Sequence, residues 1–409
     1  MDPTLRTHAD AIITAAIRAV QPDTAVRRAL ENRNFPGRVI LVAAGKAAWQ
    51  MAKTASDCLC VDDGIVITKY DHVMGPIPHC RCFEAGHPVP DDNSFAATRE
   101  ALTLTEGLTE TDTVLFLLSG GGSALFESPL IPGAELQNIT GQLLSCGADI
   151  VEINTIRKRL SAVKGGRFAQ HCFPAQVFSI VLSDIIGDPL DMIASGPAVP
   201  DSSTCAQALA IAEKYGLNLT EKTRNLLSVE TPKELTNVTT QITGSVRELC
   251  SAAAMACQSL GYEPMILTDH LCCQAKEAGS FLASIVKTHA GTGKKLAFIA
   301  GGETVVQLTG KGKGGRNQEL ALAAAEGISG IPGTALFSVG SDGTDGPTDA
   351  AGGYVDYETA AALKEQSISI YDTLRNNDAY HALQAVGGLI ITGPTGTNVN
   401  DVAVALIGS

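Results

Sequence analysis

The sequence predicts an α/β protein with a doubly wound parallel sheet, followed by a second, smaller α/β domain. Short apolar, β-branched runs alternate with longer segments of helical apolar spacing, which is the pattern of β-α-β units. Glycine-rich loops follow directly on several of the apolar runs. Ligands collect at the carboxyl ends of the strands in such sheets, so we expect the binding residues in these loops.

The first half of the chain supplies the strands and helices of the parallel sheet. A helix is expected over residues 10–20, and the segment GKAAWQMAK (45–53) opens another directly after the first strand. The same periodicities assign the remaining elements. In chain order the predicted strands are Arg38–Ala43, Gly64–Thr68, Thr113–Leu118 and Val177–Leu182, and the helices between them are Ser94–Leu108, Glu135–Cys146 and Ile156–Gln170.

A polar, threonine-rich stretch at 226–240 predicts a junction between two domains, 1–235 and 236–409. The second domain repeats the alternation of helices and strands. Its predicted helices are Val246–Leu260, Gln274–Thr288 and one that starts at Gln318, and its predicted strands are Tyr262–Leu267, Lys295–Ala300, Thr304–Leu308, Ala335–Val339, Leu389–Thr392 and Val402–Ile407. The last of these strands could instead rejoin the sheet of the first domain.

Composition limits the class of protein. A chain of 409 residues with 45% apolar and 18% charged residues is expected to form two globular domains. A net charge of −13 argues against a nucleic-acid partner, although a local basic pocket can still bind a small anion. No apolar run approaches the ~18 residues that span a membrane, and no signal peptide is expected. The spacing of the eleven cysteines differs from common zinc sites, which predicts reduced thiols in a cytoplasmic protein.

Two neighbouring loops of opposite charge give the strongest functional signal. GKGKGGRNQE (310–319) carries three cations on a glycine-rich backbone, and SDGTDGPTD (341–349) carries three carboxylates, Asp342, Asp345 and Asp349. Lysine and arginine bind anionic oxygens, glycine lets backbone amides approach a ligand, and grouped carboxylates suit Mg²⁺. The pair therefore predicts chemistry on a phosphate. Simple Asx turns are the alternative for the acidic loop and for GPTGTNVND (393–401).

Two loops of the first domain have the setting of anion sites. Gly45 and Lys46 lie where the first strand turns into a helix, so free amides and a lysine meet there. SGGGS (119–123) has the same setting after the strand Thr113–Leu118. Three successive glycines indicate a loop pressed against a ligand. A plain tight turn is the alternative for either loop.

Three further segments supply charged candidates. NTIRKRLSAVKGGR (154–167) is a basic segment from which Arg157 or Lys164 is expected to face an anion, unless it is only a solvated face. Asp184 and Asp188 follow the strand Val177–Leu182, where a carboxylate can hold Mg²⁺ or act as a base, or merely cap a turn. GGET (301–304), which contains Glu303, joins two predicted strands and could be only a hairpin.

Two familiar nucleotide motifs are absent. GTGKK (291–295) lacks the spacing of a P-loop and precedes a strand instead of following one. No GxGxxG follows the first strand, which counts against a nicotinamide cofactor.

Taken together, these motifs resemble the class II glycerate kinase family, the glycerate 2-kinases whose C-terminal part is the MOFRL domain. The resemblance spans nearly the whole chain. It rests on GKAA (45–48), LLSGGGSALF (117–126), INTIRKRLSAVKGGR (153–167), SDIIGDPLDMIASGP (183–197), GGETVV (301–306), GGRNQELAL (314–322), SVGSDGTDGPTDAAGG (338–353) and GPTGTNVND (393–401).

The resemblance implies a Rossmann-like larger domain, a smaller α/β domain and an active site in the cleft between them. It implies that ATP phosphorylates D-glycerate at its 2-hydroxyl group with Mg²⁺ as cofactor. The important lysine and arginine of the family match Lys46 and Arg316.

The sequence thus gives a hypothesis for the site. Lys46, Arg316 and Asp184 are the expected catalytic residues, with Asp184 as proton acceptor. Mg²⁺ is assigned to Asp184, Asp188 and Asp342. The expected substrate- and phosphate-binding residues are Gly45, Ser119, Gly120, Gly121, Gly122, Ser123, Arg157, Lys164, Glu303, Gly315 and Asn317.

Three alternatives stay open. The first is an NAD(P)-dependent hydroxypyruvate reductase, a name that some members of the family have carried. The second is a kinase for another small sugar acid, and the third is a ligand-binding protein without catalysis. The chain is expected to be a monomer or a homodimer.

Overall fold

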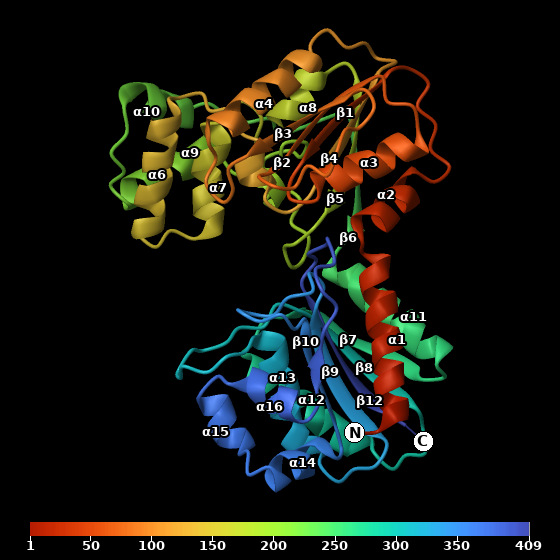
Figure 1. The fold of residues 1–409 in the computed structure, drawn as a ribbon. Helices are drawn as coiled ribbons and strands as arrows, with labels where there is room; N and C mark the ends of the chain where they lie inside the picture. The colour runs from red at the N-terminus through yellow and green to blue at the C-terminus, as the bar shows by residue number, and fades with distance from the viewer. Residues whose placement is uncertain (409) are drawn as a thin grey trace. The chain divides into compact units, whose positions relative to one another are not determined.

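The computed structural model describes residues 1–408, which form two compact units (Figure 1). One unit comprises residues 25–183 and 188–243 and is called here the parallel-sheet unit. The other comprises residues 1–24, 184–187 and the chain from 244 onward, and is called the mixed-sheet unit. No helix within residues 1–408 combines the length and the apolar character needed to cross a membrane.

The parallel-sheet unit has the strand order of a doubly wound fold, β3-β2-β1-β4-β5-β6. Its strands are β1 (Val39–Ala44), β2 (Asp63–Lys69), β3 (Cys80–Ala85), β4 (Thr113–Leu118), β5 (Gln176–Leu182) and β6 (Val238–Gly244). The pairs from β3 through β5 are parallel. The order reverses between β1 and β4, so the loops after these two strands open at the position where such sheets bind ligands.

Helices cover this sheet and also form a cluster beside it. They are α2 (Pro22–Leu30), α3 (Ala48–Cys58), α4 (Asp92–Leu104), α5 (Gly122–Leu125), α6 (Gly133–Ser145), α7 (Ile150–Arg159), α8 (Arg167–Cys172), α9 (Cys205–Lys214) and α10 (Glu221–Leu227), with a 3₁₀ turn at Ile193–Ser195. On one face Leu115 and Leu117 of β4 share a core with α2 and α3. The intervening Phe116 packs instead with Phe126 and Phe168. This alternation is the period-2 pattern of a strand.

The mixed-sheet unit is a three-layer sandwich with strand order β11-β10-β9-β12-β8-β7. Its strands are β7 (Glu263–Leu271), β8 (Leu296–Gly302), β9 (Thr334–Gly340), β10 (Gly352–Asp356), β11 (Leu389–Ile390) and β12 (Asp401–Ile407). Only β7 and β8 pair in parallel, and the other four pairs are antiparallel.

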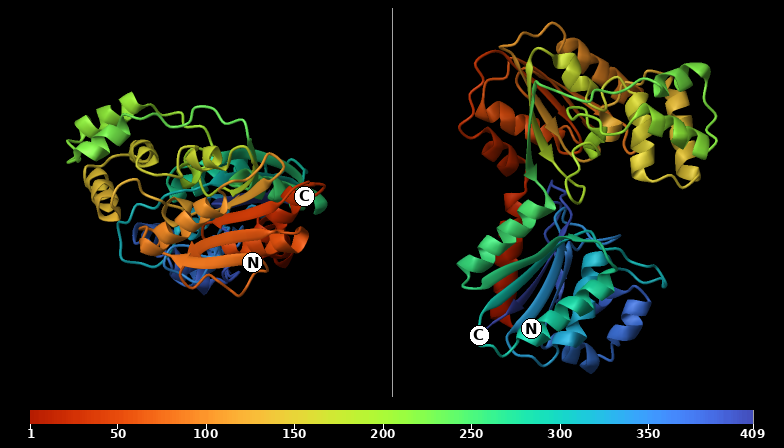
Figure 2. Two further views of the ribbon diagram at one scale, coloured as in Figure 1. Left: turned by 90° about the horizontal axis from the view of Figure 1, so that it is seen from above. Right: turned by 180° about the vertical axis from the view of Figure 1, so that it is seen from behind.

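Two layers of helices bury the two faces of this sheet (Figure 2). Helices α1 (Pro3–Ala19) and α11 (Val246–Ser259) cover one face, and the other face carries α12 (Ala275–His289), α13 (Arg316–Ile328), α14 (Thr359–Glu365), α15 (Ile370–Arg375) and α16 (Ala379–Ala385). Along β12, Val404 and Leu406 face the first layer, whereas Ala403 and Ala405 face the second.

The start of helix α1 is bonded to the end of β10 and the residues that follow it. Asp2 caps the helix by accepting from the amides of Thr4 and Leu5. The amide of Asp2 donates to Asp356 at 2.7 Å, and the terminal ammonium lies 2.8 Å from Glu358. The first helix therefore completes the mixed-sheet unit.

The structure corrects several expectations. The strand expected at 402–407 lies in the second sheet as predicted, between β8 and β9, so the alternative that it rejoins the first sheet is wrong. Residues 1–24 and 184–187, placed by the predicted boundary in the first domain, cluster with the mixed-sheet unit.

Two predicted elements also differ in form. The helix expected over Ile156–Gln170 breaks into α7, which ends at Arg159, and α8, which begins at Arg167 directly after Gly165 and Gly166 with left-handed φ values of 58° and 83°. The run 304–308 makes only an isolated bridge at Val305 and is not a strand.

The central position of β9 predicts a large cost for truncating its core. Phe337 is fully buried on β9, and Phe337→Ala should destabilise the mixed-sheet unit by about 3–5 kcal/mol. Phe281→Ala on α12, whose side chain is 63% exposed, should change stability by less than about 0.5 kcal/mol. The free energy of opening of β9 amides in hydrogen exchange measures both. Equal losses in the two variants would contradict this packing.

Candidate functional site

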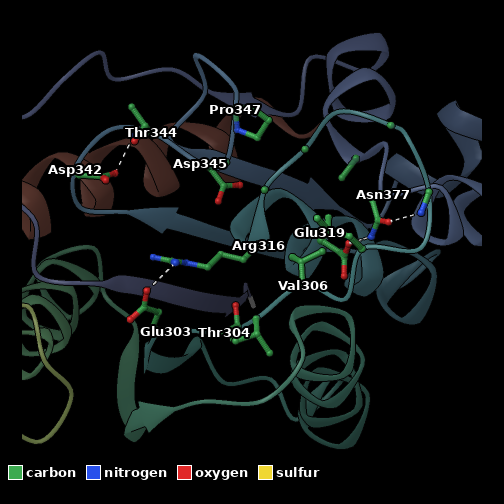
Figure 3. A pocket seen from close by; sticks show the side chains of 18 of the residues that line it. Glu303, Thr304, Val306, Arg316, Glu319, Asp342, Thr344, Asp345, Pro347 and Asn377 are labelled. Atoms are coloured by element: carbon green, nitrogen blue, oxygen red, sulfur yellow. Dashed lines mark hydrogen bonds and ion pairs between the residues drawn. The ribbon is translucent and has the colours of Figure 1, made fainter. Parts of the chain in front are cut away.

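A cavity of about 840 Å³ opens in the mixed-sheet unit at the start of α13 (Figure 3). It is lined from one side by the chain between β8 and α13 and from the other by the loop after β9. Its polar lining residues are Glu303, Thr304, Lys311, Arg316, Glu319, Asp342, Thr344, Asp345 and Asn377. Its volume lies in the range of pockets that hold small-molecule ligands.

Arg316 projects across this cavity from the first turn of α13. Its Nε atom donates to Asp401 at 2.6 Å, and one terminal nitrogen donates to Glu303 at 2.8 Å. Burial alone lowers the pKa of the guanidinium, but the bonds and charge of Asp401 outweigh burial and raise that pKa above its ordinary value. Arg316 is therefore a fixed positive charge with its orientation set by two carboxylates.

Asp345 holds the start of α13 from within. Its carboxylate accepts from the amides of Asn317 at 3.1 Å and Gln318 at 2.9 Å, which are groups that a helix start leaves without partners. A Cβ atom on Gly315 would lie 2.2 Å from Cγ of Asp345, so only glycine admits this approach. Burial raises the pKa of Asp345 to about 6, against the lowering effect of the two amide bonds.

Asn317 is a positioning residue and not an exposed ligand contact. Only 1% of it is exposed. Its side chain accepts from Ser338 at 2.6 Å and donates to Asp345 at 3.3 Å. This placement corrects the prediction that Asn317 contacts a phosphate.

The glycine-rich segment before α13 is organised by residues 376–378. The amide of Gly310 donates to the side chain of Asn377, and those of Lys311 and Lys313 donate to the side chains of Asn376 and Asp378. These amides are thus not available to a ligand, contrary to the expectation from glycine content. The Lys313 ammonium stacks on Tyr380 at 4.1 Å from the ring centroid.

Gly314 and Gly315 differ from the rest of the segment. Within residues 1–408 their amides donate to no other group. Both glycines line the cavity beside Arg316. The cavity thus offers two free amides and a guanidinium to an anion.

A second set of predicted residues meets in the parallel-sheet unit, in the loops after β1 and β4. The amide of Lys46 donates to the carbonyl of Gly120 at 2.8 Å, and the amide of Ala47 donates to the hydroxyl of Ser119 at 3.0 Å. A Cβ atom on Gly45, where φ is 131°, would lie 2.2 Å from Oγ of Ser119. The two loops are therefore interlocked at the reversal of strand order.

The loop after β4 keeps polar groups that a ligand can use. The amides of Gly120 and Gly121 donate to no group in the described chain. Gly122 begins α5 and packs so closely that a Cβ atom would lie 2.7 Å from that of Ala194. Together with the Lys46 ammonium, which forms no ion pair within residues 1–408, these amides make a second candidate anion site.

Two basic side chains stabilise this loop by donating hydrogen bonds to its backbone carbonyl groups. Arg157 donates to the carbonyl of Ser123 at 3.3 Å. Lys164 is fully buried, lies 3.3 Å from Glu127, and donates at 2.9 Å to the carbonyls of Ser123 and Phe126. Burial lowers the pKa of Lys164 to about 8. The prediction that Lys164 faces an anionic ligand is therefore corrected, because its partners are protein groups.

The carboxylates expected to hold Mg²⁺ are separated between the units. Asp342 lines the cavity and Asp184 belongs to the same mixed-sheet unit, whereas Asp188 belongs to the parallel-sheet unit. One buried oxygen of Asp188 has no hydrogen-bond partner in the described chain. Residues 1–408 contain no group of three or more side chains that could hold a metal ion by themselves. Mg²⁺ commonly uses one or two carboxylates with phosphate oxygens and water, which these single carboxylates fit.

Sequence reasoning missed several residues of both sites. Asp401 fixes Arg316 although 85 positions separate them, so only the fold reveals the pair. Lys69 is the last residue of β2, His87 follows β3, and the positive charges of Lys46 and Lys69 both act on His87. The rule that ligands gather at strand carboxyl ends applies to both residues, but β3 itself was not recognised.

Two α/β units that each present free backbone amides and a cation to an anion are typical of proteins that bind phosphates and carboxylates. Two families match the chain: DUF4147, a domain of unknown function, over residues 8–228, and the MOFRL family over residues 296–401.

Curated relatives resemble the chain over nearly its whole length. D-glycerate 2-kinase of Thermotoga maritima is 53% identical over 97% of both chains. Glycerate 2-kinase of Pyrococcus horikoshii is 39% identical over 97% of this chain and 96% of the relative. A relative from Agrobacterium vitis, provisionally named hydroxypyruvate reductase, is 38% identical over 97% of this chain and 93% of its own.

The fold agrees with this likeness. The crystal structure of glycerate kinase from Thermotoga maritima matches all of both chains with a TM-score of 0.95 and 51% identity. The chain therefore belongs to the glycerate 2-kinase family in which a DUF4147 domain precedes a MOFRL domain.

The buried ion pair of Lys164 and Glu127 predicts that Lys164 stabilises the fold, which distinguishes a structural role of this lysine from a role in ligand binding. Lys164→Met should cost about 3–5 kcal/mol, because it removes the ammonium that lies 3.3 Å from the buried carboxylate of Glu127. Adding Glu127→Leu should recover most of the loss. Lys53→Met, which breaks an exposed pair with Asp57, should cost less than about 1 kcal/mol. Urea unfolding measures all three, and a harmless Lys164→Met would refute the buried pair.

Proposed function

We propose that this protein is an ATP-dependent kinase that phosphorylates D-glycerate at its 2-hydroxyl group, giving 2-phosphoglycerate and ADP. The observation that carries the proposal is the 53% identity over 97% of the chain to a D-glycerate 2-kinase. The geometry supports it, since phosphoryl transfer depends on binding and neutralising anionic groups. Each unit supplies an anion site of that kind.

Arg316 neutralises charge on one anionic group of the reactants. Asp401 and Glu303 hold the guanidinium in place before any ligand arrives, so little reorganisation is needed on binding. The free amides of Gly314 and Gly315 add donors beside it. Lys46, with the amides of Gly120 and Gly121, binds a second anionic group.

Mg²⁺ is the proposed cofactor. Asp184 and Asp342 of the mixed-sheet unit are its proposed ligands, and Asp188 of the parallel-sheet unit is a separate candidate ligand. When bound with ATP, the ion neutralises charge on the phosphate oxygens. Asp342 is suited to this role because its half-buried carboxylate lines the cavity.

A kinase for another small sugar acid is the nearest alternative, since both sites recognise anionic groups without showing the length of the acid. Hydroxypyruvate reductase is a weaker alternative. It requires a nicotinamide site, and the loop after β1 lacks the glycine fingerprint of such sites.

We also propose a cytoplasmic location and a monomer or homodimer. All eleven cysteines are free thiols, as expected in a reducing compartment.

A coupled assay tests the reaction and its position of attack. The pure protein is incubated with D-glycerate, ATP and Mg²⁺, together with enolase but without phosphoglycerate mutase, and phosphoenolpyruvate is followed by its absorbance. A signal is expected because enolase accepts 2-phosphoglycerate. ADP without phosphoenolpyruvate would mean that the 3-hydroxyl group is phosphorylated instead or that ATP is simply hydrolysed. If neither ADP nor phosphoenolpyruvate forms, the proposal is refuted.

Arg316→Ala should lower kcat by about 10²–10³, by analogy with the loss of a donor that stabilises transition-state charge. Arg375→Ala on α15, whose side chain is 69% exposed, is the matched control and should leave kcat unchanged. Thermal unfolding checks that both variants fold. A folded Arg316→Ala enzyme with normal turnover would remove Arg316 from the mechanism.

A further inference from the structure

Three basic side chains gather at the carboxyl ends of three adjacent strands in the parallel-sheet unit. Lys46 follows β1, Lys69 is the last residue of β2, and His87 follows β3. The strands lie side by side in the order β3-β2-β1. These ends share the edge of the sheet that also carries the SGGGS loop after β4 (119–123).

None of the three side chains has a partner in the described chain. Neither ring nitrogen of His87 forms a hydrogen bond, and the two lysine ammonium groups form neither a hydrogen bond nor an ion pair within residues 1–408. All three residues are half-buried. In a chain of net charge −13, three basic groups without a carboxylate partner indicate a site for an external anion.

His87 is in contact with the loop that forms the anion site. A Cβ atom built on Gly121 would lie 3.0 Å from Cδ2 of the His87 ring, 3.2 Å from its Nε2 atom and 3.2 Å from Cγ of Lys46. The imidazole and the lysine stem therefore both pack on Gly121. An acid whose carboxylate is held by Lys46 and the amide of Gly121 would bring its neighbouring hydroxyl group toward this ring.

The surroundings keep the imidazole neutral. Burial, followed by the positive charges of Lys46 and Lys69, lowers the pKa of His87 below its ordinary value. These two lysines are the charged groups that face it, from the ends of β1 and β2. A neutral imidazole can accept a proton, which an imidazolium cannot.

We propose that His87 is a catalytic residue that accepts the proton of the hydroxyl group as its oxygen attacks the phosphorus, while Lys46 and Lys69 bind the carboxylate of the same acid. In this step the hydroxyl oxygen bonds to the γ-phosphorus of ATP, the bond from that phosphorus to the bridging oxygen breaks, ADP leaves, and the proton moves to His87. The assignment rests on the proposed kinase function and replaces Asp184 as proton acceptor.

The pH dependence of kcat/KM provides the test. Wild-type kcat/KM should fall as pH is lowered through the depressed pKa of His87, because protonation removes the acceptor. His87→Gln should lower kcat by about 10²–10⁴ and lose this acid limb. His79→Gln, at an exposed histidine of the same unit, should keep both the rate and the limb.

Lys69→Met gives a second test, because it should shift the acid limb of kcat/KM only if His87 takes part in catalysis. Removing this positive charge should raise the pKa of His87, so the acid limb should shift to higher pH. An unchanged limb in both His87→Gln and Lys69→Met would overturn the proposal and return the role to a carboxylate.

The ring signals of His87 separate this inference from the kinase function. Nitrogen-15 spectra of the wild-type imidazoles, assigned with His87→Gln, should show His87 titrating below pH 6.5 and shifting on addition of D-glycerate. A shift without turnover would leave the site intact and refute the kinase. Turnover without a shift would overturn the role of His87 alone.

Discussion

The site of the mixed-sheet unit depends on one interaction, the hydrogen bonds between the Asp345 carboxylate and the backbone amides at the start of α13. By accepting from these amides, the carboxylate fixes where the helix starts. Because Gly315 has no side chain, the carboxylate lies close beneath the backbone, and Arg316 emerges next to it toward Asp401. A guanidinium held by protein carboxylates needs no rearrangement before it meets an anion. The cost is the burial of Asp345, which raises its pKa to about 6.

Much of the fold follows from local sequence. The run Thr113–Leu118 reads as a continuous apolar stretch because β4 is buried on both faces, and its predicted bounds are those of the structure. Strand β3 (Cys80–Ala85) was missed, because as an edge strand it is half-exposed and carries charges. The run 304–308 has strand-like composition, but Val305 and Leu308 are 54% and 80% exposed and line a cavity instead of pairing.

The candidate site was predictable where one loop contains it and not where distant segments build it. Lys46 and Arg316 lie in glycine-rich motifs that can be recognised from a short stretch of sequence. Asp401 matters only because β12 begins beside the start of α13, and His87 only because β3 lies next to β2. Lys164 shows the opposite error. Its motif is basic, but burial against Glu127 turns it inward, and no periodicity in the sequence indicated that.

The position of α1 has a consequence for synthesis of the protein. This helix is translated well before the segments that cover it, because its apolar face packs against α11, which begins at Val246, and shares a core with β9, which begins at Thr334. The parallel-sheet unit can fold while Ile12 and Ile17 of α1 are still exposed, because their packing partners have not yet been synthesised. Until α11 and β9 have been translated, the nascent chain carries an amphipathic helix whose apolar face is exposed. The protein is therefore expected to be a client of chaperones that bind emerging apolar segments.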